Sequence, residues 1–275
     1  MTTLEMKMKY QGFVKKAYQV FFSPSQYEVK PKDREVIEWG NNYRVPYVAP
    51  INGTIGEIAI TTWGDANRPA VLLMHGWGGA RAQMTGFVDP LLFAGYRVAA
   101  YDQPAHGESD GKMTNILEIT PTMDLIREKE GEFDAIIAHS FGTLITSYAL
   151  TARSFPPPSK LVYFGAFNRL LDSLPRFQVL ASLPDEIIDG LRNMIYENFG
   201  RDMLDAIVNE TMVPHIDIPT LMFHDKTDNV TPVDDSRAIA NAWKSAQLIE
   251  TSGLGHRGAL QSKEIHEMVI QFLKG

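Results

Sequence analysis

Residues 138–142, with the sequence Ala-His-Ser-Phe-Gly, constrain the fold of this chain more than any other stretch. One apolar run precedes them from Phe133 and another follows them to Leu150, which predicts a strand, a sharp turn and a helix with Ser140 at the apex. The small residues at positions 138 and 142 let the strand and helix backbones approach closely. Such a turn exposes the serine hydroxyl beside the first amides of the helix, a geometry that suits a nucleophile.

Strands and helices alternate on both sides of this turn. Strands are predicted at residues 69–75, 96–102, 133–138, 161–165, 220–223 and 247–251, and helices at 81–93, 116–129, 143–150, after Thr231-Pro232 and from Ser262. Short strands are also predicted at 36–39, 43–48 and 56–63, with a hairpin turn at Asn52-Gly53. The pattern predicts an α/β fold with a mostly parallel, eight-stranded type of sheet flanked by helices.

The alternation stops between Phe167 and Pro214. Apolar residues there recur at helical spacing, a capping-box-like start lies at residues 182–185, and Gly200 ends a helix. No strand interrupts this region, so we expect an inserted helical subdomain. The expected organisation is an N-terminal helical segment at 1–34, a core at 35–167 and 214–275, and a helical insertion at 168–213.

The N-terminal segment carries apolar residues at helical spacing, with four lysines around its other face. The apolar set is Met6, Tyr10, Phe13, Ala17, Val20 and Phe21. We interpret it as a helix packed on its own domain; a membrane-surface helix or a homodimer contact is the alternative. The apolar run after Lys15-Lys16 is far shorter than a signal-peptide core and stops at Pro24, so we expect an unexported, cytoplasmic protein without a membrane span.

Composition narrows the functional classes. The chain has 275 residues, of which 44% are hydrophobic, enough for one large domain with a buried core. The formal net charge of −7 argues against a nucleic-acid partner, because phosphate binding needs a basic surface. The absence of cysteine excludes disulfides, thiolate metal sites and a cysteine nucleophile. We expect no cofactor, and no metal, since no His and carboxylate pair shows independent ligand spacing.

Serine is a weak nucleophile, so it needs a histidine base and an acid that orients that base. His256 is the candidate base, because it lies between glycines in a loop after a late strand. Asp228 is the preferred acid, since it sits a turn beyond the preceding strand and before the Val-Thr-Pro start of a helix. Asp225 is the alternative acid. Its competing interpretation is a turn residue whose side chain bonds to its own backbone.

The remaining histidines fit structural roles better. We interpret His75 and His139 as hydrogen-bonded structural histidines and His106 as a loop scaffold, while the contexts of His215, His224 and His266 suit a base less well.

The serine turn followed by Asp and then His, each after a predicted strand, resembles the α/β-hydrolase fold superfamily from about residue 43 to the end. The resemblance implies that Ser140, Asp228 and His256 form a catalytic triad, and that the 168–213 insertion is a cap. It also implies oxyanion donors at the amides of Trp77 and Phe141.

Two loops extend the resemblance. His75 and Gly76 begin the oxyanion loop, in which the bulky ring of Trp77 is expected to wall the acyl pocket. Asp102 begins a loop resembling one that braces the active site in the superfamily. Ala105 and Ala138 stand where glycine is more usual, and we expect both to be tolerated.

The expected function is a serine hydrolase that cleaves a small or medium acyl ester, thioester or lactone through an acyl-enzyme, with a small-molecule substrate as partner. A serine in place of aspartate argues against the dehalogenase and epoxide-hydrolase branches. Two alternatives are a non-hydrolytic enzyme, of the cofactor-free peroxidase or C–C lyase type, and a ligand receptor or signalling protein that retains the triad.

Overall fold

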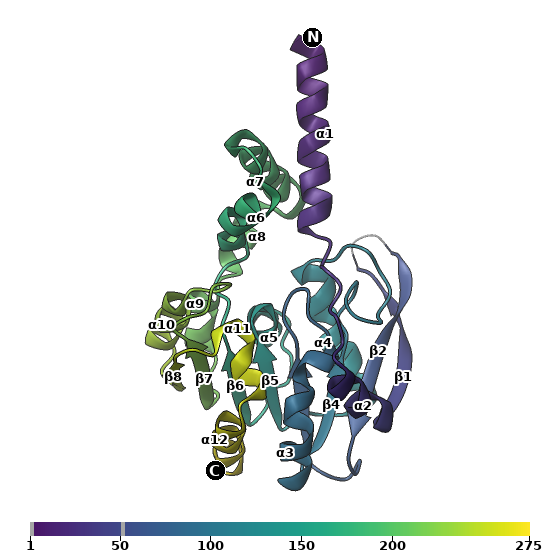
Figure 1. Ribbon diagram of the computed structural model, residues 1–275, viewed down its shortest axis with the longest axis vertical. Coiled ribbons are helices and arrows are strands. Elements are labelled where there is room, and N and C mark those ends of the chain that lie inside the picture. Colours follow the sequence, from purple (N-terminus) through teal and green to yellow (C-terminus); the bar gives the residue numbers. More distant parts are fainter. Residues whose placement is uncertain (1–2, 51–52) are drawn as a thin grey trace.

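The computed structural model describes residues 3–50 and 53–275, with side chains from Met8 onward in those ranges. Within them, eight strands form one sheet in the order β1-β2-β4-β3-β5-β6-β7-β8 (Figure 1). The strands are β1 (Asn41–Val48), β2 (Ile55–Trp63), β3 (Ala70–Met74), β4 (Arg97–Tyr101), β5 (Ala135–His139), β6 (Lys160–Phe164), β7 (Thr220–Asp225) and β8 (Ala246–Thr251).

The predicted parallel sheet is confirmed. β1 pairs with β2 and β2 with β4 in antiparallel fashion, whereas every pair from β4 to β8 is parallel. Asn52 of the predicted hairpin turn lies outside the described residues, although the antiparallel pairing of its two flanking strands is described.

The central strands are buried on both faces because helices cover the sheet on either side. In β3, Leu72 and Met74 enter one apolar core, while Val71 and Leu73 enter the other. The first core is closed by α4 (Ile116–Glu130), α5 (Phe141–Ala152) and α10 (Val233–Ala242). The second is closed by α3 (Val88–Phe93) and α12 (Lys263–Lys274), and Ser262 caps α12 through the Ile265 amide as the sequence suggests.

The predicted strand at 36–39 is wrong, because these residues complete helix α2 (Pro31–Trp39). Pro31 occupies the first helical turn, where its missing N–H costs nothing. The indole N–H of Trp63 donates to the Val36 carbonyl at 2.8 Å, and Val36 and Ile37 pack against the second core. Tertiary packing therefore overrides the β propensity of this short run.

The predicted helix at 81–93 is correct only in its second half. The chain first forms a 3₁₀ turn (Arg81–Phe87), and α-helix begins at Val88. Close packing accounts for the tighter turn, since a Cβ atom at Gly86 would lie 2.7 Å from the Leu260 carbonyl oxygen.

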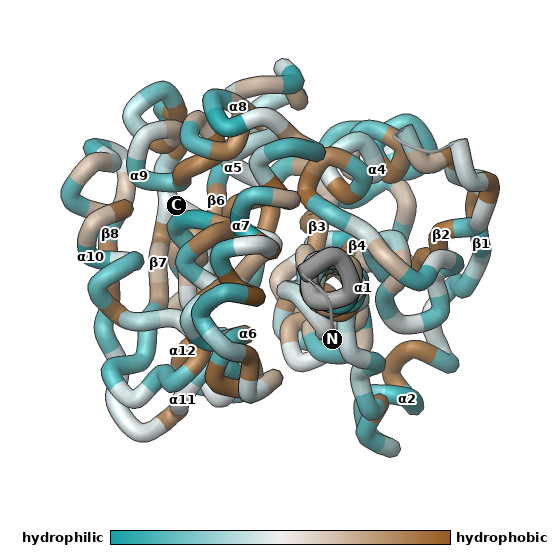
Figure 2. The backbone as a smooth tube through the Cα atoms, turned by 90° about the horizontal axis from the view of Figure 1, so that it is seen from above, coloured by the Kyte–Doolittle hydropathy of each residue, from teal (hydrophilic) through white to brown (hydrophobic). Residues whose placement is uncertain are grey.

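Between β6 and β7 the described chain forms helical segments, among them α6 (Leu174–Ala181), α7 (Asp185–Phe199), α8 (Arg201–Ala206) and α9 (Asn209–Met212), and one isolated antiparallel bridge between Arg169 and Val208. Helix α1 (Thr3–Phe21) stands beside α7 and away from the sheet (Figure 1), and Figure 2 looks down its axis. Val14 and Ala17 of α1 join Leu191 and Ile195 of α7 in a third apolar cluster. Of the helices in the described ranges, none is both long and apolar enough to cross a membrane.

Candidate active site

Ser140 lies between the end of β5 and the first residue of α5, with φ of 53° and ψ of −123°. Few non-glycine residues adopt positive φ, so this turn holds local strain. The neighbouring glycines make the turn possible by close approach. A Cβ atom at Gly142 would lie 2.7 Å from the His75 carbonyl oxygen, and one at Gly76 would lie 2.8 Å from the Ser140 Cβ.

His256 and Asp228 meet at the same end of the sheet. His256 is the second residue of the short helix α11 (Gly255–Gly258), which follows β8. Its Nδ1 lies 2.7 Å from Asp228 Oδ2. Because a carboxylate accepts, Nδ1 carries the proton and Nε2 is left as the basic nitrogen. Burial opposes ionisation of Asp228, but hydrogen bonds from His224 and His256 hold the pKa of this carboxyl well below its usual range.

Asp225 does not contact His256 but braces its own loop. Its Oδ1 accepts the amide of Thr227 at 2.9 Å, and its Oδ2 accepts the Thr251 hydroxyl at 2.8 Å and the Leu254 amide at 3.0 Å. These bonds overcome the effect of burial and lower the pKa of the Asp225 carboxyl. Of the two acids considered from the sequence, Asp228 is therefore the one that the fold pairs with histidine.

The side chain of His139 contacts His256, a relationship that the sequence does not reveal. The two imidazole rings lie 4.6 Å apart between centroids, and His139 Nε2 donates to the His256 carbonyl at 2.9 Å. Burial, reinforced by the charge that His256 can carry, lowers the pKa of His139 well below its usual value. A neutral, hydrogen-bonded His139 agrees with the structural role predicted for it.

Ser140 is linked to this pair through its neighbour in sequence. Within the described ranges no hydrogen bond joins Ser140 and His256, although His139 directly precedes the serine and its ring lies tilted by 51° against that of His256. Catalytic hydrogen bonds are commonly long in enzymes without substrate.

The loop after β3 lies against the start of α5. The ring of Trp77 packs edge-on against Phe141, with centroids 5.6 Å apart and planes at 89°. Among the backbone hydrogen bonds of the described loops and turns, none is donated by the amide N–H of Trp77 or of Phe141. Both amides are thus free to meet a developing negative charge. The expectation that the Trp77 ring walls an acyl pocket stays a prediction.

His75 fixes the base of this loop. Its Nε2 accepts the Gln103 amide at 3.0 Å, so the Nδ1 proton is donated to the Gly76 carbonyl at 2.8 Å. Burial lowers the pKa of His75 to about 4, which keeps the ring neutral at neutral pH. The side chain of Gln103 donates in return to the His75 carbonyl at 2.7 Å.

Asp102 organises the second loop through a buried ion pair with Arg81, which sequence reasoning missed. One Asp102 oxygen accepts the Arg81 amide at 2.6 Å, and the other contacts the Arg81 guanidinium and accepts the Glu108 amide at 2.8 Å. Arg81 also donates to Thr61 at 2.8 Å. Ala105, in the same loop, has φ of 63°, which explains why glycine would suit this position.

His224 lies beside the Asp228–His256 pair. His224 contacts Ser236 Oγ at 2.6 Å and the Thr231 carbonyl at 3.0 Å, and its Nε2 lies 3.4 Å from Asp228 Oδ2. It therefore acts as a second neighbour of the acid, which no local sequence signal indicates. Among the described residues no group of three or more His, Asp or Glu side chains is arranged to hold a metal ion.

Comparison with known proteins places this geometry in context. A family model described as the alpha/beta hydrolase family matches residues 70–268. A non-heme haloperoxidase from Rhodococcus erythropolis is 24% identical over 263 residues, covering 77% of this chain and 93% of that protein.

Two solved structures resemble most of the chain. The bromoperoxidase from Bacillus anthracis superimposes with a TM-score of 0.65 at 18% identity, covering 86% of this chain and 100% of the other. The esterase PF2001 from Pyrococcus furiosus gives a TM-score of 0.63 at 18% identity, with coverages of 92% and 97%. At these identities the likenesses show a shared fold.

Proposed function

Since this chain belongs to the α/β-hydrolase family, we propose that it is a serine hydrolase that cleaves a small or medium acyl ester, thioester or lactone. The observation that carries the proposal is the Asp228–His256 pair, joined at 2.7 Å, beside a serine on a strained turn. Esterases among the proteins of similar fold support the same reaction class.

The proposed mechanism follows from the proton positions. His256 Nε2 takes the proton of the Ser140 hydroxyl, and the serine oxygen attacks the substrate carbonyl. The amides of Trp77 and Phe141 would stabilise the oxyanion, each contributing about 3 kcal/mol. His256 then returns the proton to the leaving group. Water, deprotonated by the same nitrogen, hydrolyses the acyl-enzyme and restores the serine.

Asp228 has an electrostatic and a positioning role in this scheme. Its ionised carboxylate holds the Nδ1–H tautomer and stabilises the imidazolium that forms during each proton transfer. The amides of Val230 and Thr231 donate to its Oδ1 at 2.7 and 3.0 Å, which fixes the carboxylate orientation.

We further assign the helices at 168–213 as a cap on the core formed by 35–167 and 214–275. In support, Arg176 of α6 donates to the Asn229 carbonyl next to the proposed acid. The N-terminal segment packs with these helices, since the Tyr10 hydroxyl donates to the Glu186 carbonyl at 2.6 Å. Helix α1 thus extends the cap, whereas the residues that follow it lie against the core, because Asp33 accepts the Thr85 hydroxyl at 2.8 Å and α2 continues past residue 34.

Turnover of p-nitrophenyl esters from acetate to decanoate tests the function. Purified wild-type protein should hydrolyse the shorter esters with repeated turnover, and Ser140→Ala should not. Ester consumption that stops at one equivalent of protein would contradict an enzyme and favour a ligand receptor.

One observation favours a second candidate, namely that a relative is named a non-heme haloperoxidase. In that reaction hydrogen peroxide replaces water in attacking the acyl-enzyme, and a peracid leaves in place of the carboxylic acid. Bromination of monochlorodimedone in acetate buffer with peroxide and bromide measures it. A rate exceeding that of ester hydrolysis would make this the principal activity.

A further inference from the structure

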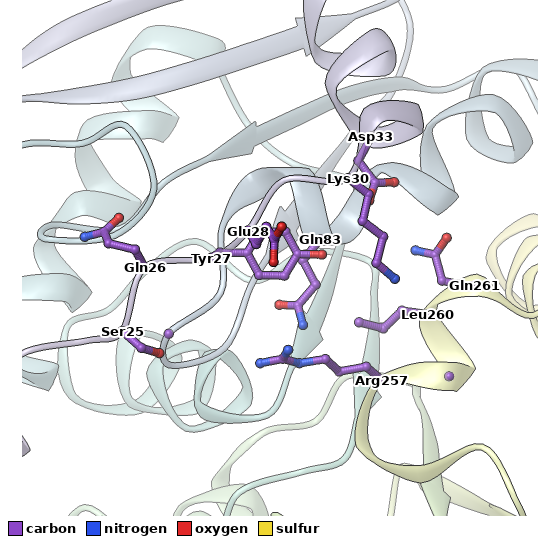
Figure 3. Close-up of a pocket in the computed structure, with 12 residues that line it drawn as sticks. Ser25, Gln26, Tyr27, Glu28, Lys30, Asp33, Gln83, Arg257, Leu260 and Gln261 are labelled. Carbon is purple, nitrogen blue, oxygen red and sulfur yellow. The ribbon is translucent and has the colours of Figure 1, made fainter.

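A cavity of about 450 Å³ lies next to the proposed catalytic residues, between the N-terminal segment and the loop that carries His256 (Figure 3). Ser25 and Tyr27 form one wall, Gln83 lies at the back, and Arg257 and Leu260 form the opposite wall. The cavity touches both parts of the proposed active site along the chain, because Arg257 follows His256 and Gly78 follows Trp77.

The side-chain amide of Gln83 lacks hydrogen-bond partners in the ranges that the structure describes. Its side chain lines the cavity, the residue is only 4% exposed, and neither its amide oxygen nor its amide nitrogen has a hydrogen-bond partner among the described residues. Leaving a buried amide unpaired costs free energy. A Cβ atom at Gly79 would collide with the Gln83 side-chain oxygen, and both amide atoms are shielded by the surrounding residues. A ligand in the cavity would therefore satisfy this amide once the side chain turns toward it.

Arg257 supplies a positive charge at the same place. Figure 3 shows its guanidinium pointing toward the Gln83 amide and the Ser25 hydroxyl. In the described part of the chain no carboxylate lies within ion-pair distance of Arg257, whose guanidinium instead lies 5.9 Å from the ring centroid of Tyr27. A planar guanidinium binds a carboxylate through two parallel hydrogen bonds.

The acidic residues of the cavity do not occupy this point. Asp33 lies at the far side of Figure 3 from Arg257 and accepts the Thr85 hydroxyl at 2.8 Å. Glu28 is exposed to solvent, and Lys30 adds a second positive charge at the rim. Around Arg257 the cavity therefore offers one cation and two neutral groups, an amide and a hydroxyl, that can donate hydrogen bonds.

We propose that this cavity binds the carboxylate group of an acidic small molecule, held by Arg257 with Gln83 and Ser25. The oxyanion loop reaches from the serine to the cavity: a Cβ atom at Gly76 would lie 2.8 Å from the Ser140 Cβ, and one at Gly79 would collide with the Gln83 side-chain oxygen. The carboxylate belongs either to the substrate itself or to a separate acid. Only the first of these sources rests on the proposed function.

Direct binding tests the site without any turnover. Isothermal titration of the full chain with succinate at low ionic strength should show one site in wild type and an affinity at least about tenfold weaker in Arg257→Gln. Arg153→Gln removes the same charge from a remote surface pair with Asp124 and should bind as wild type does. No binding to wild type, or equal binding by Arg257→Gln, would overturn the proposal.

Gln83→Leu provides an independent variant. It should also weaken succinate binding, whereas its thermal midpoint should equal or exceed that of wild type because an unpaired buried amide is removed. A lowered midpoint together with unchanged succinate affinity would show that Gln83 serves packing alone and would contradict its assignment.

Matched esters then identify the source of the carboxylate. Mono-p-nitrophenyl glutarate carries the acid, and p-nitrophenyl pentanoate is its neutral counterpart. A selective rise of about tenfold in KM for the glutarate ester in Arg257→Gln identifies the substrate as the source. Equal kinetics for both esters, with succinate binding lost, identify a separate acid. Succinate binding without hydrolysis of either ester would refute the proposed function and retain the site.

Discussion

The carboxyl end of the sheet and the helical region formed by α1, α6 and α7 are held together by different forces. At the sheet end, His75, His139 and His224 each bond to named groups across the loops. In the helical region, Val14 and Leu191 belong to a cluster of apolar side chains. Hydrogen bonds fix direction, whereas apolar contacts tolerate sliding. We therefore expect orientation-dependent chemistry in the first region and an adjustable cover in the second.

The largest expected effect is on turnover at the sheet end. Ser140→Ala should reduce kcat for p-nitrophenyl butyrate by at least about 10³-fold, because the nucleophile is removed. The unfolding midpoint should change little, since alanine keeps the same backbone turn. Ser159→Ala, at a surface hydroxyl bonded to Asp134, is the control and should keep full activity. Comparable activity in the two variants would place the chemistry elsewhere.

Variants of the two aspartates in the loop after β7 distinguish a catalytic role from a structural one. Asp228→Asn should lower kcat by about 10³-fold or more by disturbing the His256 tautomer. Asp225→Asn should lower kcat much less but reduce the free energy of unfolding by about 1–3 kcal/mol, because one acceptor oxygen of a buried, fully bonded carboxylate is replaced by an amide group that donates. Urea unfolding and steady-state kinetics on both variants measure the contrast. A larger loss of kcat in Asp225→Asn would reverse the assignment of the acid.

The sequence predicts the sheet-end features that depend on neighbours along the chain. The Ser140 turn is recognisable because its small flanking residues and apolar runs are adjacent in sequence. The His139 contact with His256 spans 117 positions, and Arg81 reaches Asp102 across 21, so neither leaves a local signal. The wrong prediction of a strand at 36–39 has the same cause, namely contacts between residues distant in sequence. A hydrogen bond from Trp63 and packing against the core stabilise these residues as a helix.

A mutation that creates a cavity in the helical region should destabilise its packing and leave most of the catalytic activity. Leu191 is fully buried, so Leu191→Ala should cost about 2–5 kcal/mol of local stability. Amide hydrogen exchange in α1 and α7 should then accelerate, while kcat for p-nitrophenyl acetate falls less than tenfold. Faster exchange in β5 and β7 as well would show that the two regions unfold as one unit.

Acid should destabilise the sheet end through His75. Its pKa is lowered to about 4 in the folded state, from the ordinary value of 6.5. Between these values the unfolded chain binds a proton that the folded chain does not, so stability falls as pH drops through this window. The contribution of His75 to the free energy of unfolding should fall by about 2 kcal/mol from pH 7 to pH 5, so His75→Asn should lose less stability over this range than wild type. Identical pH dependence in both proteins would remove His75 as a contributor.

The central claim is that Ser140 is an activated nucleophile. Reaction of the folded protein with a fluorophosphonate probe, followed by mass spectrometry of the digested product, tests it most directly. We expect a single phosphonylated residue, Ser140, and a slower reaction in Asp228→Asn. An unlabelled wild-type protein, or equal labelling of Ser140→Ala, would contradict the claim.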